Sequence, residues 1–116
     1  MKKIILLFSI LFITQFSYSQ VFVEDVDINE LDIKYIQLIG VNTSMFGVKF
    51  KVFVDYGQKA KMMKADGIKD SEGETKKFNT MIDALNFMHS NGWKYINYTE
   101  AEFSGKIRYV YLLEKK

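Results

Sequence analysis

The sequence TMIDALNFMHSNGW, residues 80–93, decides the fold because it is the clearest helix in the chain. Met81, Leu85 and Met88 recur at the spacing of an α-helix, so their side chains form one apolar stripe. Asp, Asn and Ser side chains occupy the other side of the helix. We therefore expect an amphipathic helix over residues 80–91 whose apolar stripe packs against another element.

Both ends of this helix carry signals in the sequence. Thr80 and Asp83 stand three residues apart, as in a capping box in which Asp replaces the usual Glu. Gly92 is expected to end the helix in the left-handed conformation that glycine accepts, and Trp93 to pack back on Met88. These residues predict where the helix stops and do not indicate a cofactor site.

Strands are expected on both sides of the helix in the sequence. After it, residues 94–103 and 107–115 are predicted to be two strands joined by a tight turn at Ser104-Gly105-Lys106. Before it, residues 48–56 alternate between apolar and other side chains, and residues 33–41 are rich in β-branched residues. A short segment with turn residues separates these two, so they are expected to pair as a hairpin.

This order of elements predicts an α+β fold: a small antiparallel β-sheet with one helix packed on one face, in the order β-β-(hairpin)-α-β-β. The hairpin before the helix is the polar segment 59–77, which carries two turn signals. We expect a single α+β domain over residues 33–116, preceded by a solvated acidic lead-in over residues 20–32.

The lead-in contains acidic residues and no basic one. Asp25, Asp27 and Asn29 match the first ligands of a calcium loop. Glu30 stands where that loop needs glycine, and the twelfth position is Ile36 in place of a carboxylate. The sequence therefore favours no metal site here.

The first 19 residues are typical of a secretory signal peptide. Lys2 and Lys3 precede an apolar run over residues 4–16, and small residues lead to a cleavage site between Ser19 and Gln20. A membrane span needs about 20 apolar residues, which is more than this run has. We expect an exported protein, either periplasmic or secreted, with no membrane span after the signal is removed.

The composition argues against several classes of function. The chain of 116 residues has no cysteine and one histidine, which excludes disulfide scaffolds, thiol catalysis and multi-histidine metal sites. Removing Lys2 and Lys3 from the 16 basic residues leaves 14, which equals the 14 acidic ones. A net charge near zero argues against a nucleic-acid partner. We expect no cofactor, no metal and no catalytic residue.

The predicted strands carry apolar residues on both faces of the sheet, and one helix covers only one face. The residues expected on the second face are Ile36, Leu38, Phe53, Val110 and Leu112. A large exposed apolar face usually marks an interface. The sequence therefore predicts contact with a second copy or with an envelope protein, unless residues 21–31 fold over these side chains or the side chains are scattered and form no patch.

Two other features bear on chemistry. His89 lies near the edge of the apolar stripe, where we expect a partly buried histidine with one hydrogen-bond partner. Glu100 and Glu102 share one face of a strand, and a pair of carboxylates can serve in glycoside hydrolysis. Exposed aromatic residues such as Tyr98 would add to a carbohydrate site. Glutamates beside a hairpin turn are more often simply solvated.

Several segments resemble uncharacterised small secreted proteins of Bacteroidota, a domain of unknown function in which a helix ends in Gly-Trp before a C-terminal hairpin. The matching segments are Phe78 to Met88, Gly92-Trp93, Tyr109 to Lys115, Tyr35 to Gly40 and Asp55 to Gln58. The resemblance covers nearly all of the chain after the signal. It implies export and a similar fold, and it carries over no activity and no catalytic residue.

The expected function is therefore that of an exported, non-catalytic interaction module that self-associates through the second sheet face or uses it to bind a partner. The alternative is a small carbohydrate-binding or hydrolytic module that uses the strand with Glu100 and Glu102.

Overall fold

The computed structural model describes residues 19–42, 50–59 and 67–116, without the side chain of Phe103. The expected signal peptide up to residue 18 and the turn of the first long hairpin lie outside the described residues. The elements in chain order are β1 (Phe22–Val23), β2 (Val26–Asp27), the 3₁₀ helix η1 (Ile28–Glu30), β3 (Tyr35–Asn42), β4 (Phe50–Asp55), β5 (Ile68–Lys69), α2 (Met81–Ser90), β6 (Trp93–Phe103) and β7 (Lys106–Lys115).

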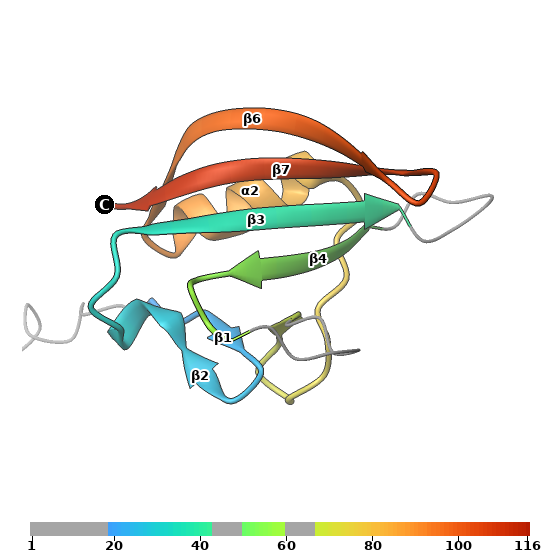
Figure 1. Cartoon of the computed structure of the whole chain (residues 1–116). Coiled ribbons are helices and arrows are strands. Elements are labelled where there is room, and N and C mark those ends of the chain that lie inside the picture. Colours follow the sequence, from blue (N-terminus) through green and yellow to red (C-terminus); the bar gives the residue numbers. More distant parts are fainter. Residues whose placement is uncertain (1–18, 43–49, 60–66) are drawn as a thin grey trace, which may run out of the picture.

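Four strands form the main sheet, in the order β4-β3-β7-β6, and every neighbouring pair is antiparallel (Figure 1). The pairs β3–β4 and β6–β7 are the two hairpins that the local sequence predicts. The pairing of β3 with β7 brings these hairpins together into one sheet. Among the described residues there is one α-helix and a second, smaller sheet, so the predicted α+β class is confirmed.

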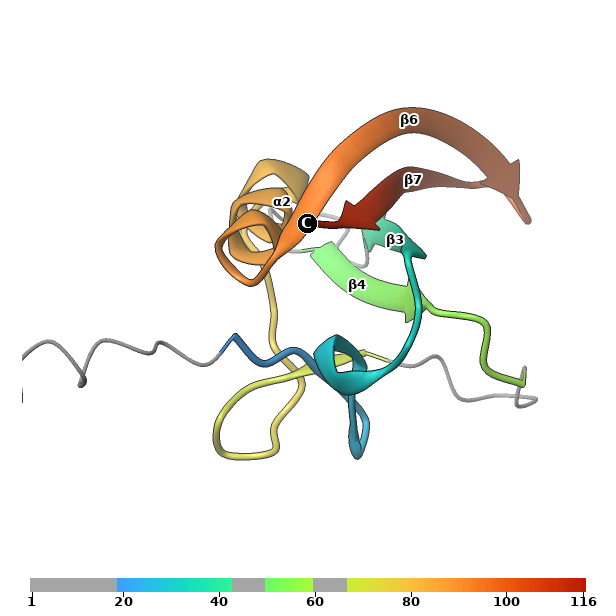
Figure 2. The same ribbon diagram turned by 90° about the vertical axis from the view of Figure 1, so that its left-hand side faces the viewer.

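The helix α2 packs on one face of the curved main sheet (Figure 2). The predicted start is confirmed: Thr80 Oγ1 accepts a hydrogen bond from the Asp83 N–H at 3.1 Å. The Asp83 carboxylate in turn accepts the backbone N–H of Asn79 at 3.3 Å. Gly92 ends the helix with a φ of +92°, in the left-handed region predicted for it.

The β6–β7 hairpin has the tight turn that its sequence favours. Ser104 and Gly105 have φ angles of 53° and 78°, as a two-residue turn matched to the strand twist requires. Near its start, β6 has a bulge between Tyr95 and Asn97. Figure 1 shows β6 bowing outward along the edge of the sheet. This curvature fits the local bending that a bulge produces.

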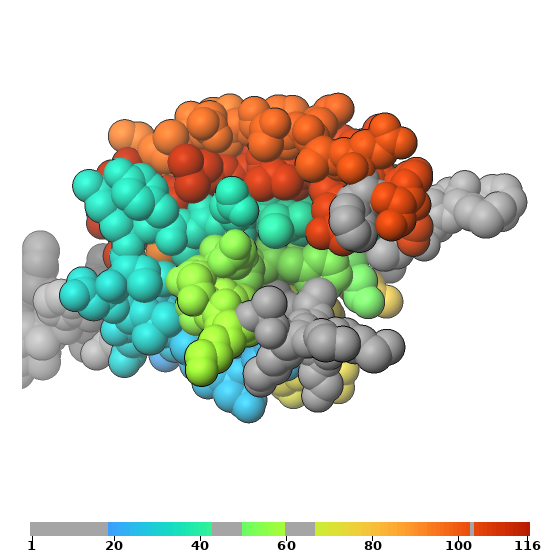
Figure 3. All heavy atoms as spheres, viewed as in Figure 1, coloured from blue at the N-terminus to red at the C-terminus, as the bar shows by residue number. Residues whose placement is uncertain are grey.

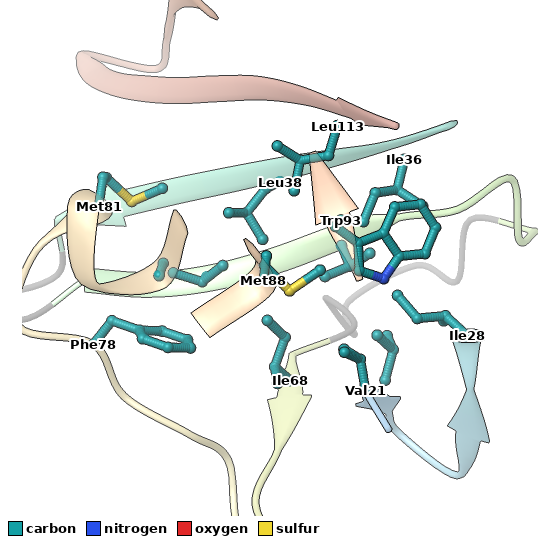
Figure 4. Packing of buried hydrophobic residues seen from close by; sticks show 14 residues of the cluster. Val21, Ile28, Ile36, Leu38, Ile68, Phe78, Met81, Met88, Trp93 and Leu113 are labelled. Atoms are coloured by element: carbon teal, nitrogen blue, oxygen red, sulfur yellow. The ribbon is translucent and has the colours of Figure 1, made fainter. Parts of the chain in front are cut away.

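The core lies between the main sheet, α2 and the small sheet β2-β1-β5 (Figure 4). Val21, Val23 and Ile28 are completely buried, and β1 pairs with β5. The expectation of a solvated lead-in over residues 20–32 is therefore corrected: Val21, Val23 and Ile28 belong to the core, whereas Phe22 stays exposed. Local polarity could not show this, because β1 is held by a strand some 45 residues further along the chain.

The β3 side chains point in the opposite direction from the one expected. Ile36 and Leu38 were expected on the second face, but they are 2% and 0% exposed and lie in the core. The physical reason is the placement of polar groups. Gln37 must point to water, so its neighbours point inward and Tyr35 points outward.

Within the three described ranges, no helix is both long and apolar enough to cross a membrane.

Candidate functional site

The face of the main sheet opposite α2, here called the outer face, has an apolar centre. Its members are half-buried side chains from three strands: Ile39, Val41, Phe53, Val110 and Leu112. Ile39 lies between Phe53 on one side and Val110 on the other in the strand register. Figure 3 looks onto this face, with α2 behind the sheet, and no described helix or strand crosses in front.

Polar residues surround this apolar centre. Lys51 and Arg108 lie on either side of Val41 at one end of the face, and both are exposed. Asp55 lies at the other end, opposite Gln37. The outer face therefore has a basic end and an end that carries an exposed carboxylate.

A second carboxylate at the Asp55 end of the outer face is largely compensated. Glu114 forms a salt bridge of 3.3 Å with Lys34, and it lies opposite Lys94 in the strand register. This leaves Asp55 as the main negative group at its end of the face.

The structure brings together three of the five residues predicted for the second face. Phe53, Val110 and Leu112 lie together on the outer face. Ile39 and Val41 complete the group and were missed, because the wrong phase was assigned to their strand. Gln37 is the residue that could have indicated them. It is polar and must face solvent, and Ile39 and Val41 lie on the same side of the strand as Gln37.

A second group of aromatic rings lies on the opposite face, where the core face reaches the β6 edge. This tyrosine cluster consists of Tyr95, Tyr98, Tyr109 and Tyr111. The centroids of Tyr98 and Tyr111 are 4.7 Å apart, and those of Tyr98 and Tyr109 are 6.5 Å apart with nearly parallel planes at 13°. Tyr95 meets Tyr111 edge-on at 6.3 Å. Tyr95 and Tyr98 are 52% and 38% exposed, so the cluster is open to solvent along β6.

One carboxylate is attached to this cluster. The Tyr98 hydroxyl donates a hydrogen bond of 2.5 Å to Glu100 Oε1. Packing among the tyrosine rings desolvates the Tyr98 hydroxyl and, together with this bond, raises its pKa well above the usual value for tyrosine. The pKa of Tyr111 is raised as well, first by desolvation and then by the charge of Tyr95 and Glu100. The raised pKa values favour the protonated form of the Tyr98 and Tyr111 hydroxyls.

Glu102 is exposed and lies two residues from Glu100 on the same strand, as the sequence predicted. The structure thus places Tyr98 and both glutamates on one surface. Because Glu100 holds a tyrosine hydroxyl, its role in this arrangement is that of a hydrogen-bonding and charged group at the rim of an aromatic surface.

His89 is exposed rather than partly buried, which corrects that expectation. Its partner is Lys116, whose Nζ lies 3.3 Å from His89 Nε2 and donates to the His89 carbonyl oxygen at 2.8 Å. These contacts satisfy a carbonyl at the helix C-terminus with a cation, which is a stabilising arrangement.

The acidic pattern at the start of the chain has a structural role. Asp27 Oδ1 accepts the backbone N–H groups of Val21 and Asn29, at 3.2 and 3.1 Å. It therefore caps η1 and holds the first strand in place. In the described part of the chain, no three His, Cys, Asp or Glu side chains are grouped so that they could hold a metal ion.

An open hollow of about 450 Å³ lies at the small sheet. Phe22, Glu24, Asp25 and Lys69 are among its lining residues. The Lys69 ammonium lies 3.7 Å from the Glu24 carboxylate, so the charges here partly compensate one another. Glu24 and Lys69 are thus engaged with each other within the small sheet.

No protein-family model, no curated protein and no solved structure matches the chain. The resemblance to secreted Bacteroidota proteins stays a prediction. The outer face and the tyrosine cluster are the surfaces that bear on function.

Proposed function

We propose that this chain is an exported, non-catalytic interaction module that self-associates through its outer face. The observation that carries the proposal is the apolar centre of that face, which no described element covers. Apolar side chains grouped on one open sheet face gain free energy when a second surface removes them from water. The apolar run at residues 4–16 supports export.

A second copy of the chain suits this face because of its charges. When two copies pack face to face and antiparallel, the basic end with Lys51 and Arg108 of one copy lies over the Asp55 end of the other. The same contact then occurs twice around a twofold axis, as in most homodimers. Sheets that pack face to face in this way are common, with a spacing of about 10 Å.

The test is sedimentation velocity on residues 20–116, the chain expected after cleavage. Gln37→Arg adds a bulky positive charge at the Asp55 end of the outer face, where the basic end of the other copy would lie. The substitution does not touch the core, because Gln37 is exposed. Leu112→Asp places a charge in the apolar centre itself. We expect each variant to shift the protein from dimer to monomer.

The matched control is Ile82→Asp, which changes another exposed apolar residue that lies on α2. Circular dichroism shows whether each variant keeps its fold. The proposal fails when folded Gln37→Arg and Leu112→Asp sediment as the unmodified chain does, or when Ile82→Asp dissociates it equally.

A further inference from the structure

The aromatic rings of this protein differ in whether a lysine accompanies them. The Lys115 ammonium lies 5.6 Å from the centre of the Trp93 ring. Lys76 lies 4.9 Å from the Phe87 ring and also contacts Phe78, and Lys34 accompanies the Tyr35 ring in the same way. A cation at such a distance is attracted to the negative face of the ring.

The tyrosine cluster has no such partner among the described residues, although it is the largest group of rings. The neighbouring basic residues of the hairpin point the other way. Lys94, Lys106 and Arg108 pair in register with residues of the outer face, so their side chains leave from the opposite side of the sheet.

Two carboxylates face this cluster instead. Glu100 and Glu102 alternate with outward-facing residues on β6 and are exposed. Only one Glu100 oxygen has a partner among the described residues, namely the Tyr98 hydroxyl. Its other oxygen is open to a donor from outside. An open aromatic surface beside unpaired negative charge attracts a cation and repels an anion such as a nucleic acid.

The form of the ligand follows from the edge of the sheet. β6 is the last strand of the main sheet and pairs, within the described ranges, with β7 alone. It spans Trp93–Phe103 and contains no proline, so its outer edge offers backbone groups to an added strand. An extended peptide on this edge directs alternate side chains to the tyrosine face.

We propose that the tyrosine cluster and Glu100 bind an arginine or lysine side chain of an extended basic peptide that lies along β6. The guanidinium or ammonium group lies over the exposed rings of Tyr95 and Tyr98 and donates to the free Glu100 oxygen. This site lies on the opposite side of the sheet from the outer face, so it does not depend on self-association.

The test is isothermal titration of the chain expected after cleavage, residues 20–116, with acetyl-Gly-Arg-Gly-Arg-Gly-amide. The reference probe is the same peptide with citrulline in place of arginine, which keeps the shape and removes the charge. We expect the arginine peptide to bind at least about tenfold more tightly, as a cation–π contact and a charged hydrogen bond together imply. Rising salt concentration should weaken this binding.

Variants locate the site. Glu100→Gln should weaken binding of the arginine peptide about tenfold, whereas Glu72→Gln, at an exposed glutamate far along the chain, should leave it unchanged. Tyr98→Leu should weaken binding more than Tyr98→Phe, which keeps the ring. Circular dichroism monitors the fold of each variant.

Four outcomes would overturn the proposal. Equal affinity for the arginine and citrulline peptides excludes a cation site, and absence of binding to either excludes a peptide site. Tight binding of cellohexaose with none of the arginine peptide would identify a carbohydrate surface. Tetramethylammonium binding as tightly as the peptide would show that the site takes small cations and that the strand edge adds nothing.

Discussion

At the scale of single residues, Asn29 connects three parts of the fold. Its Nδ2 donates to the carbonyl oxygen of Asn91 at 2.9 Å, a contact that the chain expected after cleavage keeps, and to that of Ser19 at 3.1 Å. Its Oδ1 accepts the indole N–H of Trp93 at 2.7 Å. Trp93 is 1% exposed, so its polar N–H has no access to water and needs this partner.

We predict that Asn29→Ala lowers the free energy of unfolding by about 1–3 kcal/mol, because it leaves the buried Trp93 N–H without an acceptor. Urea denaturation followed by tryptophan fluorescence measures this loss, since the chain has a single tryptophan. Asn86→Ala, at an exposed position of α2, is the control and should change stability little. Equal stability of the two variants would show that the Trp93 bond contributes nothing.

Tyr98 makes the free energy of unfolding depend on pH in the alkaline range. Its pKa is raised in the folded protein, so the folded state keeps a proton that the unfolded state releases near pH 10. The contribution of Tyr98 to the free energy of unfolding is fully present below the pKa that Tyr98 has in the unfolded state. It is lost as the pH rises through the pKa that Tyr98 has in the folded state. Tyr111 acts in the same direction.

We therefore predict that the free energy of unfolding decreases above about pH 10 and that Tyr98→Phe reduces this decrease. Urea denaturation at a series of alkaline pH values measures it. Tyr35→Phe is the control, because Tyr35 is exposed and lies outside the cluster. A Tyr98→Phe curve parallel to that of the unmodified chain would contradict the role assigned to Tyr98.

At the scale of elements, the contact between α2 and β3 depends on a glycine. A Cβ placed on Gly40 would overlap the Met81 thioether, so the Met81 side chain packs on β3 in its present position only because Gly40 has no side chain. We predict that Gly40→Ala lowers the free energy of unfolding by about 1–3 kcal/mol through overpacking. Thermal unfolding of the variant and of the unmodified chain measures this change.

The double variant Gly40→Ala with Met81→Ala separates overpacking from other effects. Removing the Met81 side chain relieves the overlap, so the two substitutions together should cost less than the sum of the two alone. Strict additivity would show that this contact does not limit the approach of the helix.

The elements that the sequence predicted are those with local causes. These local causes act over only a few residues of the sequence, as at the Thr80 cap, the helix end at Gly92 and the turn at Ser104-Gly105. The prediction of which β3 side chains face the core was wrong. Tyr35 and Ile36 are both large, so only the polar Gln37 indicates which alternate residues face solvent. Phase in such a strand is set by its partners in the core.

The burial of the first strands could not be predicted either. β1 is two residues long and is held by pairing with β5 and by packing of Val21 and Val23 in the core. Such long-range pairing leaves no local signature in the sequence. For the same reason the sequence grouped Tyr98 with Glu100 and Glu102 on one strand but did not show the tyrosine cluster, which requires β6 and β7 in register.

At the scale of the whole molecule, the two surfaces lie on opposite sides of the main sheet. A dimer formed through the outer face would leave both tyrosine clusters open, one on each copy. Two such sites on one particle bind a ligand with two basic segments more tightly than either site alone.

The charges of the outer face predict how two copies are oriented. Lys51→Glu should weaken association, because it places a carboxylate over Asp55 of the other copy. The double variant Lys51→Glu with Asp55→Lys should restore much of the association. The carboxylate introduced at position 51 of one copy would then lie over the ammonium introduced at position 55 of the other, so opposite charges meet again. Sedimentation equilibrium at low salt measures the unmodified chain, Lys51→Glu, Asp55→Lys and the double variant. Additive weakening in the double variant would contradict the antiparallel arrangement.

The most direct test of self-association is the molar mass of residues 20–116 in solution, measured by size-exclusion chromatography with light scattering over a range of concentrations. We predict a species of twice the monomer mass that dissociates only on dilution, and loss of this species in Gln37→Arg. A monomer at every concentration would contradict this prediction.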